Sequence, residues 1–196
     1  MIADRRLALH HDERGATVVE FALVLPVLLL ALFGLFDLSY NMYTASMLHG
    51  AIQKASRDAS IEGAAPAQLD SRVADAVHAI APGAAIDFER KSYADFSDVA
   101  RAEDFTDTNG DGLCSNGEPF EDVNGNGTWD SDRGVTGQGG ARDAVLYTVE
   151  VTYPRMFPIA GFANIPDTYT ATARTVLRNQ PWGLQQVARP TVRNCA

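Results

Sequence analysis

The chain begins with a charged segment that gives way at Ala16 to an almost uninterrupted apolar run. Of the 21 residues from Ala16 to Phe36, only Glu20 is charged. At about 1.5 Å per residue, a helix of this length spans a hydrocarbon core of roughly 30 Å. The run is longer than the apolar region of a secretory signal peptide, which has about 7–15 residues. The pattern therefore predicts a membrane-spanning helix, which we place at residues 16–40 after a leader of residues 1–15.

A helical hydrophobic pattern continues past the apolar run. Leu48, Ile52 and Ala55 recur at helical spacing on one face, and charged residues occupy the other faces. We therefore expect residues 41–63 to form an amphipathic stem that continues the membrane helix. Gly63 is a suitable stop signal for it.

The rest of the chain predicts a small α+β head. Its apolar and β-branched positions favour a helix at Ala67–Ile80 and strands at Ile86–Tyr93, Ala144–Tyr153 and Thr168–Leu177. Because loops connect the strands, we expect an antiparallel sheet that packs on the stem. We place this head at residues 64–180, with an acidic insertion at 103–133, and expect an irregular tail at 181–196.

Basic residues predict the orientation of the membrane helix. Arg5, Arg6 and Arg14 precede the apolar run, whereas the first lysine or arginine after it is Lys54. Positively charged flanking residues stay on the cytoplasmic side of a membrane. We therefore expect the N-terminus in the cytoplasm and the head on the other side of the membrane.

The net charge of −9 is concentrated in the acidic insertion. Without this segment's acids the chain has 16 acidic and 16 basic residues, so the whole excess lies there. Because no basic groove is evident, nucleic acid is not an expected partner. The dense carboxylates suggest a cation instead. They are Glu103, Asp104, Asp107, Asp111, Glu118, Glu121, Asp122, Asp130 and Asp132.

The acidic insertion contains the spacing of a calcium-binding loop, twice. Short oxygen-bearing side chains at alternating positions converge on one ion, a glycine allows the sharp turn, and an acid at position 12 closes the shell. The candidate ligands of the first copy are Asp107, Asn109, Asp111, Leu113 (through its carbonyl), Ser115 and Glu118. Those of the second copy, displaced by 15 residues, are Asp122, Asn124, Asn126, Thr128, Asp130 and Asp132.

The second copy has Arg133 at its twelfth position, so its closing acid is missing. A hydrated loop without an ion is the alternative interpretation of both copies. The duplication, the charge and the placement outside the cytoplasm favour calcium, with one or two ions. The affinity expected of an extracellular site is about 10⁻⁴–10⁻³ M. The pattern resembles the tandem Asp/Asn/Gly calcium loops of secreted proteins.

Cysteine and histidine usage adds little chemistry. Two cysteines are too few for a disulfide framework or a thiolate metal site, although Cys114 and Cys195 can pair outside the cytoplasm. The sequence shows no Ser/His/Asp or Cys/His grouping typical of nucleophilic catalysis, and no nucleotide-binding glycine pattern after a strand. We therefore do not expect an enzyme.

Glu20 is the exceptional residue of the apolar run. A carboxylate at the centre of a bilayer costs on the order of 2.5–3.5 kcal/mol, and such residues usually have a function. Because Glu20 lies little more than a turn inside the run, its side chain can instead reach the interface at small cost. Its position alone leaves both interpretations open.

The junction between leader and apolar run resembles the prepilin peptidase site of type IV pilins. The residues that carry this resemblance are Gly15, Ala16, Glu20 and Phe21. The continuation Phe-Ala-Leu-Val-Leu-Pro over residues 21–26, followed by Phe33, Gly34 and Tyr40, is similar to the TadE-like pseudopilins of bacterial tight-adherence pili. The resemblance covers roughly residues 14–60.

The resemblance implies specific roles for these residues. A prepilin peptidase would cleave after Gly15, and Ala16 would become the new N-terminus. Glu20 would be the fifth residue of the mature chain, where the family's acid is linked to processing and to pairing with a neighbouring subunit's amine. Such pairing is physically reasonable, because a carboxylate in lipid is most stable beside a cation.

These implications predict a minor pseudopilin that aids assembly of a tight-adherence pilus, with other pilins or pseudopilins as partners. Its expected location is the bacterial inner membrane, with the head in the periplasm, or outside the cell once it is assembled in a pilus. Two alternatives stay open. One is a permanently anchored calcium-binding adhesin or sensor module of the cell envelope, and the other is a membrane-tethered hydrolase with a metal in the acidic insertion.

Overall fold

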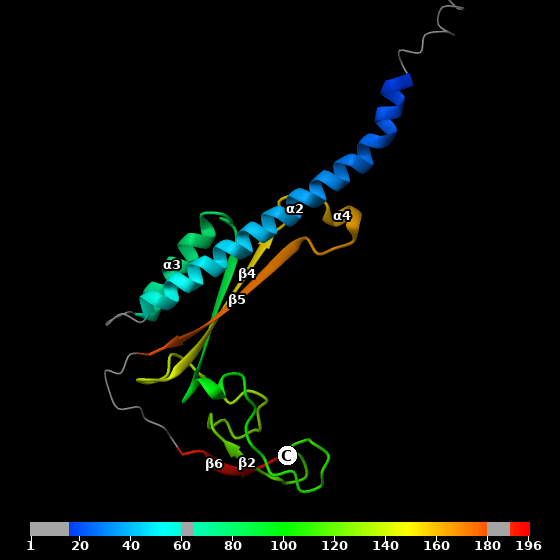
Figure 1. Ribbon diagram of the computed structural model, residues 1–196. Helices are drawn as coiled ribbons and strands as arrows, with labels where there is room; N and C mark the ends of the chain where they lie inside the picture. The colour runs from blue at the N-terminus through cyan, green and yellow to red at the C-terminus, as the bar shows by residue number, and fades with distance from the viewer. Residues whose placement is uncertain (1–15, 60–64, 180–188) are drawn as a thin grey trace, which may run out of the picture. The chain divides into compact units, whose positions relative to one another are not determined.

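The computed structural model describes residues 16–59, 65–179 and 189–196 (Figure 1). The predicted leader, including Gly15, lies outside the described residues. The chain divides into two compact units. We call them the N-terminal unit, Met1–Met42 with Pro154–Tyr169, and the sheet unit, Tyr43–Tyr153 with Thr170–Ala196.

One helix, α2 (Ala16–Ala59), contains the predicted membrane segment and residues 41–59 of the predicted stem. The expected end of the stem at Gly63 lies outside the described residues. No side chain between Thr17 and Phe36 is buried and most are exposed, so most of the apolar run is available to a surrounding medium. Pro26 lies inside the helix, where it removes a backbone donor. The part of α2 from Tyr43 onward belongs to the sheet unit and buries Leu48 and Ile52, as the helical spacing predicted.

The N-terminal unit adds one short element to its part of α2. This is the helix α4 (Ala160–Ala163), within the connection between two strands of the sheet unit. Asn164 ends α4 in the left-handed conformation with φ 51°, which asparagine tolerates better than most residues.

The sheet unit has a four-stranded sheet in the order β3-β1-β4-β5. The strands are β1 (Ala85–Tyr93), β3 (Val135–Thr136), β4 (Ala144–Pro154) and β5 (Thr168–Arg178). β1 pairs antiparallel with both β3 and β4. Alternate residues of β4, from Val145 to Tyr153, are buried, as expected for a strand with one face on a core. The predicted α+β fold with a long N-terminal helix and a small antiparallel sheet is confirmed.

The helix α3 (Pro66–His78) packs on this sheet. Pro66 occupies its first turn, where a missing N–H costs nothing. Asp70 of α3 accepts hydrogen bonds from Arg90 of β1 (2.5 Å) and from the hydroxyl of Tyr147 of β4 (2.6 Å). Burial, together with the bond to Asp70, raises the pKa of Tyr147. The short 3₁₀ helix η2 (Phe96–Asp98) follows β1 and precedes the acidic insertion.

The acidic insertion contributes to a second sheet of two strands. β2 (Pro119–Asp122) pairs antiparallel with β6 (Thr191–Asn194), with Pro119 opposite Asn194. An irregular tail was expected at 181–196, and β6 differs from that expectation. Its four residues are too few to form a recognisable pattern, and their conformation depends on a partner strand far away in the sequence.

Candidate functional site

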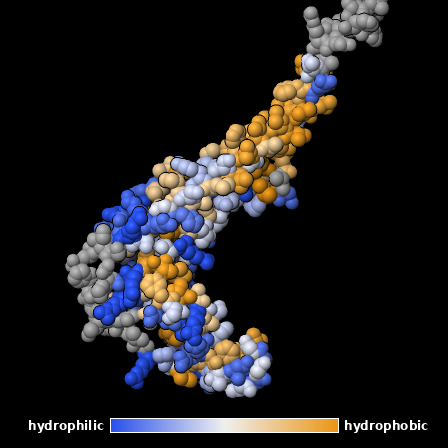
Figure 2. All heavy atoms as spheres, in the orientation of Figure 1, coloured by the Kyte–Doolittle hydropathy of each residue, from blue (hydrophilic) through white to orange (hydrophobic). Residues whose placement is uncertain are grey.

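The predicted processing and assembly residues lie at the start of α2. Ala16 is its first residue, and the side chains of Glu20 and Phe21 are exposed on its surface. Figure 2 shows that apolar residues cover this end of the helix. By length and composition α2 can cross a membrane, and no other helix among the described residues meets that test.

The first calcium-like copy, loop 1 (residues 107–118), is organised by its own carboxylates. Asp107 accepts hydrogen bonds from the amides of Gly110 (2.6 Å) and Gly112 (2.9 Å). Both glycines have positive φ, 79° and 75°, which allows the chain to turn around the carboxylate. The side chain of Asn109 accepts a hydrogen bond from the amide of Asp111 (2.8 Å). The side chain of Asp111 accepts one from the amide of Leu113 (2.8 Å). The spacing read from the sequence therefore does converge in space.

Glu118 closes loop 1. It is buried, and its Oε1 accepts hydrogen bonds from the amides of Thr108 (2.7 Å) and Asn109 (3.3 Å). Its Oε2 accepts the amide of Ser115 at 3.2 Å. These bonds, that from Thr108 first, hold the pKa of Glu118 below its usual value, so the carboxylate is ionised at neutral pH.

Loop 1 brings three carboxylates together. One oxygen each from Asp107, Asp111 and Glu118 lie within 4.8 Å of one another. Carboxylate oxygens are hard donors. They suit Ca²⁺, which takes six to eight oxygen ligands in all, better than they suit a softer metal. The residues present therefore fit a calcium ion, with Asp107 and Asp111 exposed and Glu118 buried.

The second copy, loop 2 (residues 122–133), has the same backbone frame. Asp122 accepts hydrogen bonds from the amides of Gly125 (2.7 Å) and Gly127 (3.0 Å), as Asp107 does from Gly110 and Gly112. The side chain of Asn124 accepts the amide of Asn126 at 3.0 Å, and that of Asn126 accepts the amide of Thr128 at 2.8 Å. The duplication seen in the sequence is thus a duplication of conformation.

Loop 2 is closed from outside itself, by Glu103. This buried carboxylate accepts the amides of Val123 (2.8 Å) and Asn124 (3.5 Å) through Oε1, and that of Asp130 (3.1 Å) through Oε2. Each of these three amides lies 15 residues after one of the three amides that donate to Glu118 in loop 1. The acid that the sequence lacks at position 12 is therefore supplied by a residue upstream of both loops. The 12-residue calcium spacing does not identify Glu103, because Glu103 precedes the loop that it completes. The offset of 15 residues between the copies does relate it to Glu118.

The other predicted ligands of loop 2 have different surroundings. Asp130 accepts hydrogen bonds from the side-chain amides of Asn124 (2.7 Å) and Asn126 (2.5 Å), and so lies in the loop. Asp132 faces β1, where it accepts from Lys91 and from the hydroxyl of Tyr93, both at 2.9 Å. Burial and this bond raise the pKa of Tyr93 to about 12.

The C-terminal strand connects to both loops. A disulfide bond joins Cys114 of loop 1 to Cys195, with their Cα atoms 5.4 Å apart. Arg193 of β6 donates from Nε to Asp122 of loop 2 at 2.6 Å. The Asp122 side chain is fully buried, so a guanidinium already compensates the first carboxylate of loop 2. Sequence reasoning missed Arg193, because its link to Asp122 spans 71 residues.

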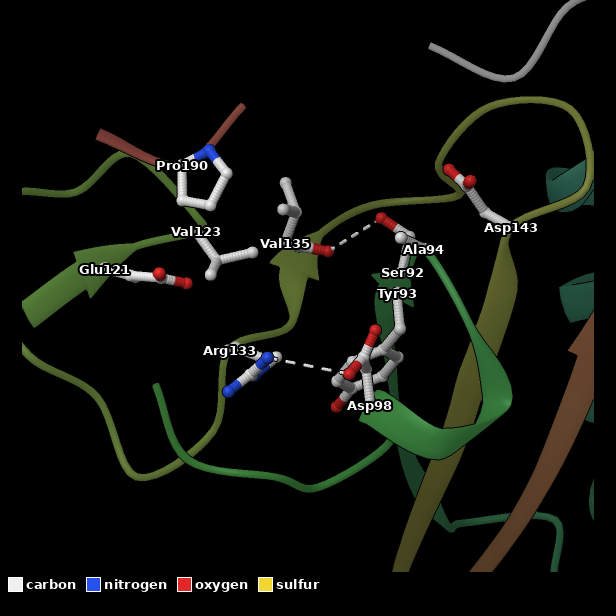
Figure 3. A pocket seen from close by; sticks show the side chains of 10 residues that line it. All are labelled: Ser92, Tyr93, Ala94, Asp98, Glu121, Val123, Arg133, Val135, Asp143 and Pro190. Carbon is white, nitrogen blue, oxygen red and sulfur yellow. Dashed lines mark hydrogen bonds and ion pairs between the residues drawn. The ribbon is translucent and has the colours of Figure 1, made fainter. Parts of the chain in front are cut away.

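A cavity of about 260 Å³ lies in the sheet unit beside the acidic insertion (Figure 3). Arg133 is a cationic residue of its wall. The guanidinium donates hydrogen bonds to the carbonyl of Ala102 (2.5 Å) and to the carboxylate of Asp104 (2.8 Å). Asp98 also lies 3.5 Å from this guanidinium. The hydrogen bond from Arg133 lowers the pKa of Asp104 more than burial raises it, so this pKa is below its usual value. Arg133 and Asp98 of the wall are therefore engaged in ion pairs that hold the insertion, and we assign the cavity no ligand.

Comparison with known proteins concerns the N-terminal part alone. Residues 15–57 match the family model described as TadE-like protein. No curated protein and no solved structure matches the chain. The matched range contains Gly15, Ala16, Glu20 and Phe21, on which the resemblance depended, and it ends before the acidic insertion. The resemblance drawn from the sequence is thereby confirmed: residues 15–57 of this chain are similar to the TadE-like family.

Proposed function

We propose that the protein is a minor pseudopilin that takes part in assembly of a tight-adherence pilus. The observation that carries this proposal is the TadE-like match at 15–57, which coincides with an exposed apolar helix beginning at Ala16. TadE-like proteins associated with pili are typically structural, and a structural role needs no catalytic site. The apolar surface of α2 would first lie in the inner membrane and then among the helices of other pilins.

Processing after Gly15 is the chemical step of this proposal. A prepilin peptidase would remove the leader and leave the amine of Ala16 at the start of α2. Glu20 is exposed one turn further on, where it can reach the amine of a neighbouring copy or pilin. In lipid this contact replaces an uncompensated charge by an ion pair. The cytoplasmic N-terminus required for cleavage is supported by Arg5, Arg6 and Arg14.

The mass of the mature chain tests the proposal. We expect the protein isolated from membranes that contain its prepilin peptidase to begin at Ala16, as measured by intact mass and N-terminal sequencing. Gly15→Val should retain the leader. Gly34→Ala is the matched control, since Gly34 lies within α2, away from the proposed cleavage site, and an added Cβ would contact nothing within 4 Å.

Retention of Met1, or of residue 2, in the wild-type protein would reject the pseudopilin. The alternative, a permanently anchored calcium-binding adhesin or sensor, predicts that uncleaved form. A chain that begins at Ala16 in the wild type and in Gly34→Ala, but not in Gly15→Val, supports processing at the proposed bond.

We further propose that loop 1 binds calcium. The proximity of oxygens from Asp107, Asp111 and Glu118 supports this site, and their mutual repulsion would be relieved by a divalent cation. The side chain of Asn109, the carbonyl of Leu113 and the hydroxyl of Ser115 are the remaining candidate ligands. Loop 2 is a weaker candidate, because Arg193 already occupies one side of Asp122.

Calorimetry on the full chain in detergent tests the calcium site. With a dissociation constant of about 10⁻⁴–10⁻³ M, calcium at about 10 mM should stabilise the folded state by roughly 1.4–2.7 kcal/mol. Asp107→Asn and Asp111→Asn should remove both the heat and the stabilisation. Asp87→Asn makes the same charge change on an exposed position of β1 and should have neither effect. A wild-type chain without heat or thermal shift at millimolar calcium would reject the site.

A further inference from the structure

A second apolar segment lies in the N-terminal unit, apart from α2. Residues 156–166, which include α4, contain no charged residue, and we call them the apolar loop. Met156 is 59% exposed and Phe162 is 75% exposed. Leu23, in the middle of the apolar run of α2, is 74% exposed. The apolar loop thus presents large hydrophobic side chains as openly as the proposed membrane helix does.

Aromatic contacts fix the level of the apolar loop along α2. The ring of Phe157 lies 6.1 Å from that of Phe33 and 5.8 Å from that of Phe36. Both phenylalanines belong to the final turn of the apolar run that ends at residue 36. In Figure 1, α4 accordingly lies beside α2. When the run fills the hydrocarbon core, the apolar loop reaches the edge of that core.

Charged and polar groups close the base of the apolar loop. Arg155 forms an ion pair with Asp37, the first charged residue after the apolar run. The amide of Arg155 donates to the carbonyl of Asp167 (2.9 Å), and its Nε donates to the carbonyl of Pro166 (2.9 Å). Asn41 donates to Asp37 at 3.0 Å. The two ends of the loop are therefore held together at the polar boundary, with its apolar residues beyond.

We propose that the apolar loop inserts into the membrane interface beside the end of α2, as a second membrane contact. The occupant is the lipid of the leaflet at that end of the helix, because the ring of Phe157 joins the loop to Phe33 and Phe36 in the apolar run of α2. Aromatic and aliphatic side chains partition into this interfacial region, and the paired Arg155 and Asp37 suit its polar edge. Two contacts restrict the rotation and tilt of the helix in the membrane, which a single helix leaves free. The inference depends on the proposed membrane insertion of α2 and is independent of cleavage at Gly15.

Spin labels test the position of the loop in the full chain, reconstituted into vesicles of phosphatidylethanolamine and phosphatidylglycerol. Under non-reducing conditions Cys114 and Cys195 are joined, so a single introduced cysteine takes the label. Phe162→Cys and Met156→Cys report on the loop, and Val27→Cys, 69% exposed, reports on α2. Phe96→Cys is the matched control, since Phe96 is a 49% exposed phenylalanine of the sheet unit.

Collision with oxygen, which is concentrated in lipid, is compared with collision with a water-soluble nickel chelate. We expect the ratio of oxygen to nickel collisions at the two loop positions to be several-fold above that at Phe96→Cys and close to that at Val27→Cys. Loop labels that collide mainly with nickel, while Val27→Cys reports lipid, would overturn this inference alone. Labels shielded from both reagents would indicate a protein partner and overturn it as well. A water-exposed Val27→Cys would overturn membrane insertion of α2 and this inference together.

Discussion

Loops 1 and 2 share a backbone frame but are completed in different ways. In loop 1 the closing carboxylate, Glu118, lies within the repeat, and the amides that it binds are 3–10 residues away. In loop 2 the closing carboxylate, Glu103, lies upstream, and its amides are 20–27 residues away. The same three amide positions are satisfied in both. The difference shows that the geometry of the frame is conserved between the copies while the source of its acid is not.

The two loops also differ in how the C-terminal strand holds them and in their charge. Loop 1 is joined to Cys195 by a covalent bond, whereas loop 2 is joined to Arg193 by an ion pair. The guanidinium compensates Asp122, while Asp107 of loop 1 is bonded to backbone amides and is left exposed to solvent. Loop 1 therefore has the greater need of a cation, and loop 2 has the greater dependence on distant residues.

Removing the disulfide bond should have the largest effect on this comparison. The bond closes a span of 81 residues, and the chain-entropy estimate for such a span is about 4.5 kcal/mol. We expect Cys114→Ser with Cys195→Ser to lose stability of this order, measured by urea unfolding of the full chain in detergent. Trp129 provides a fluorescence signal from loop 2; the centroid of its ring lies 5.7 Å from that of Phe105. An unchanged urea midpoint, with wild type likewise insensitive to reductant, would contradict a structural role for the bond.

Replacing each closing carboxylate by glutamine tests how much stability each of the two loops gains from its acid. Glu103→Gln should cost on the order of 3 kcal/mol, because a neutral amide cannot satisfy all the buried N–H groups that face it. Glu118→Gln should destabilise less, since it releases only residues close in sequence, yet it should weaken calcium binding more. Glu121→Gln, on an exposed position of β2, is the matched control. Unfolding curves and calcium titrations of the three variants give the comparison, and equal behaviour of Glu103→Gln and Glu121→Gln would refute the role of Glu103.

How far the sequence could predict this arrangement depends on the range of the interactions. β4 was expected at Ala144–Tyr153 and is found at Ala144–Pro154, because alternating burial is a local signal. The frame of loop 1 was also predictable, since every position needed is in one short stretch. Glu103 and β6 were not, because each acts through partners that only the folded chain brings near. Arg193 likewise meets Asp122 only after β6 has paired with β2.

Alkaline pH should loosen the contact between loop 2 and β1. The hydroxyl of Tyr93 donates to Asp132, and burial with this bond raises its pKa from 10.0 to about 12. Because the folded state favours the protonated phenol, this stabilisation is complete below pH 10 and is lost as the pH rises towards 12. At about pH 11 the loss is roughly 1.4 kcal/mol.

Tyr93→Phe isolates that contribution, because Tyr147 also has a raised pKa and remains in the variant. The urea midpoint should fall less between neutral pH and about pH 11 in Tyr93→Phe than in wild type. Tyr43→Phe, on an exposed position of α2, should fall as much as wild type does. Equal losses in all three proteins would assign the alkaline sensitivity to other groups.

Removing the guanidinium from loop 2 should have the smallest effect on stability and the most informative effect on calcium. The Arg193 side chain is 47% exposed, so solvent screening limits the cost of Arg193→Gln to about 1 kcal/mol or less. The variant leaves Asp122 in a frame that matches loop 1, with Glu103 as its closing carboxylate. We therefore expect Arg193→Gln to bind calcium with a higher stoichiometry than wild type in calorimetry, whereas Arg189→Gln, at an exposed arginine nearby in sequence, should not. If the stoichiometry is unchanged, the ion pair does not explain the difference between the loops. Loop 2 would then be a structural repeat whose carboxylates serve to bind amides alone.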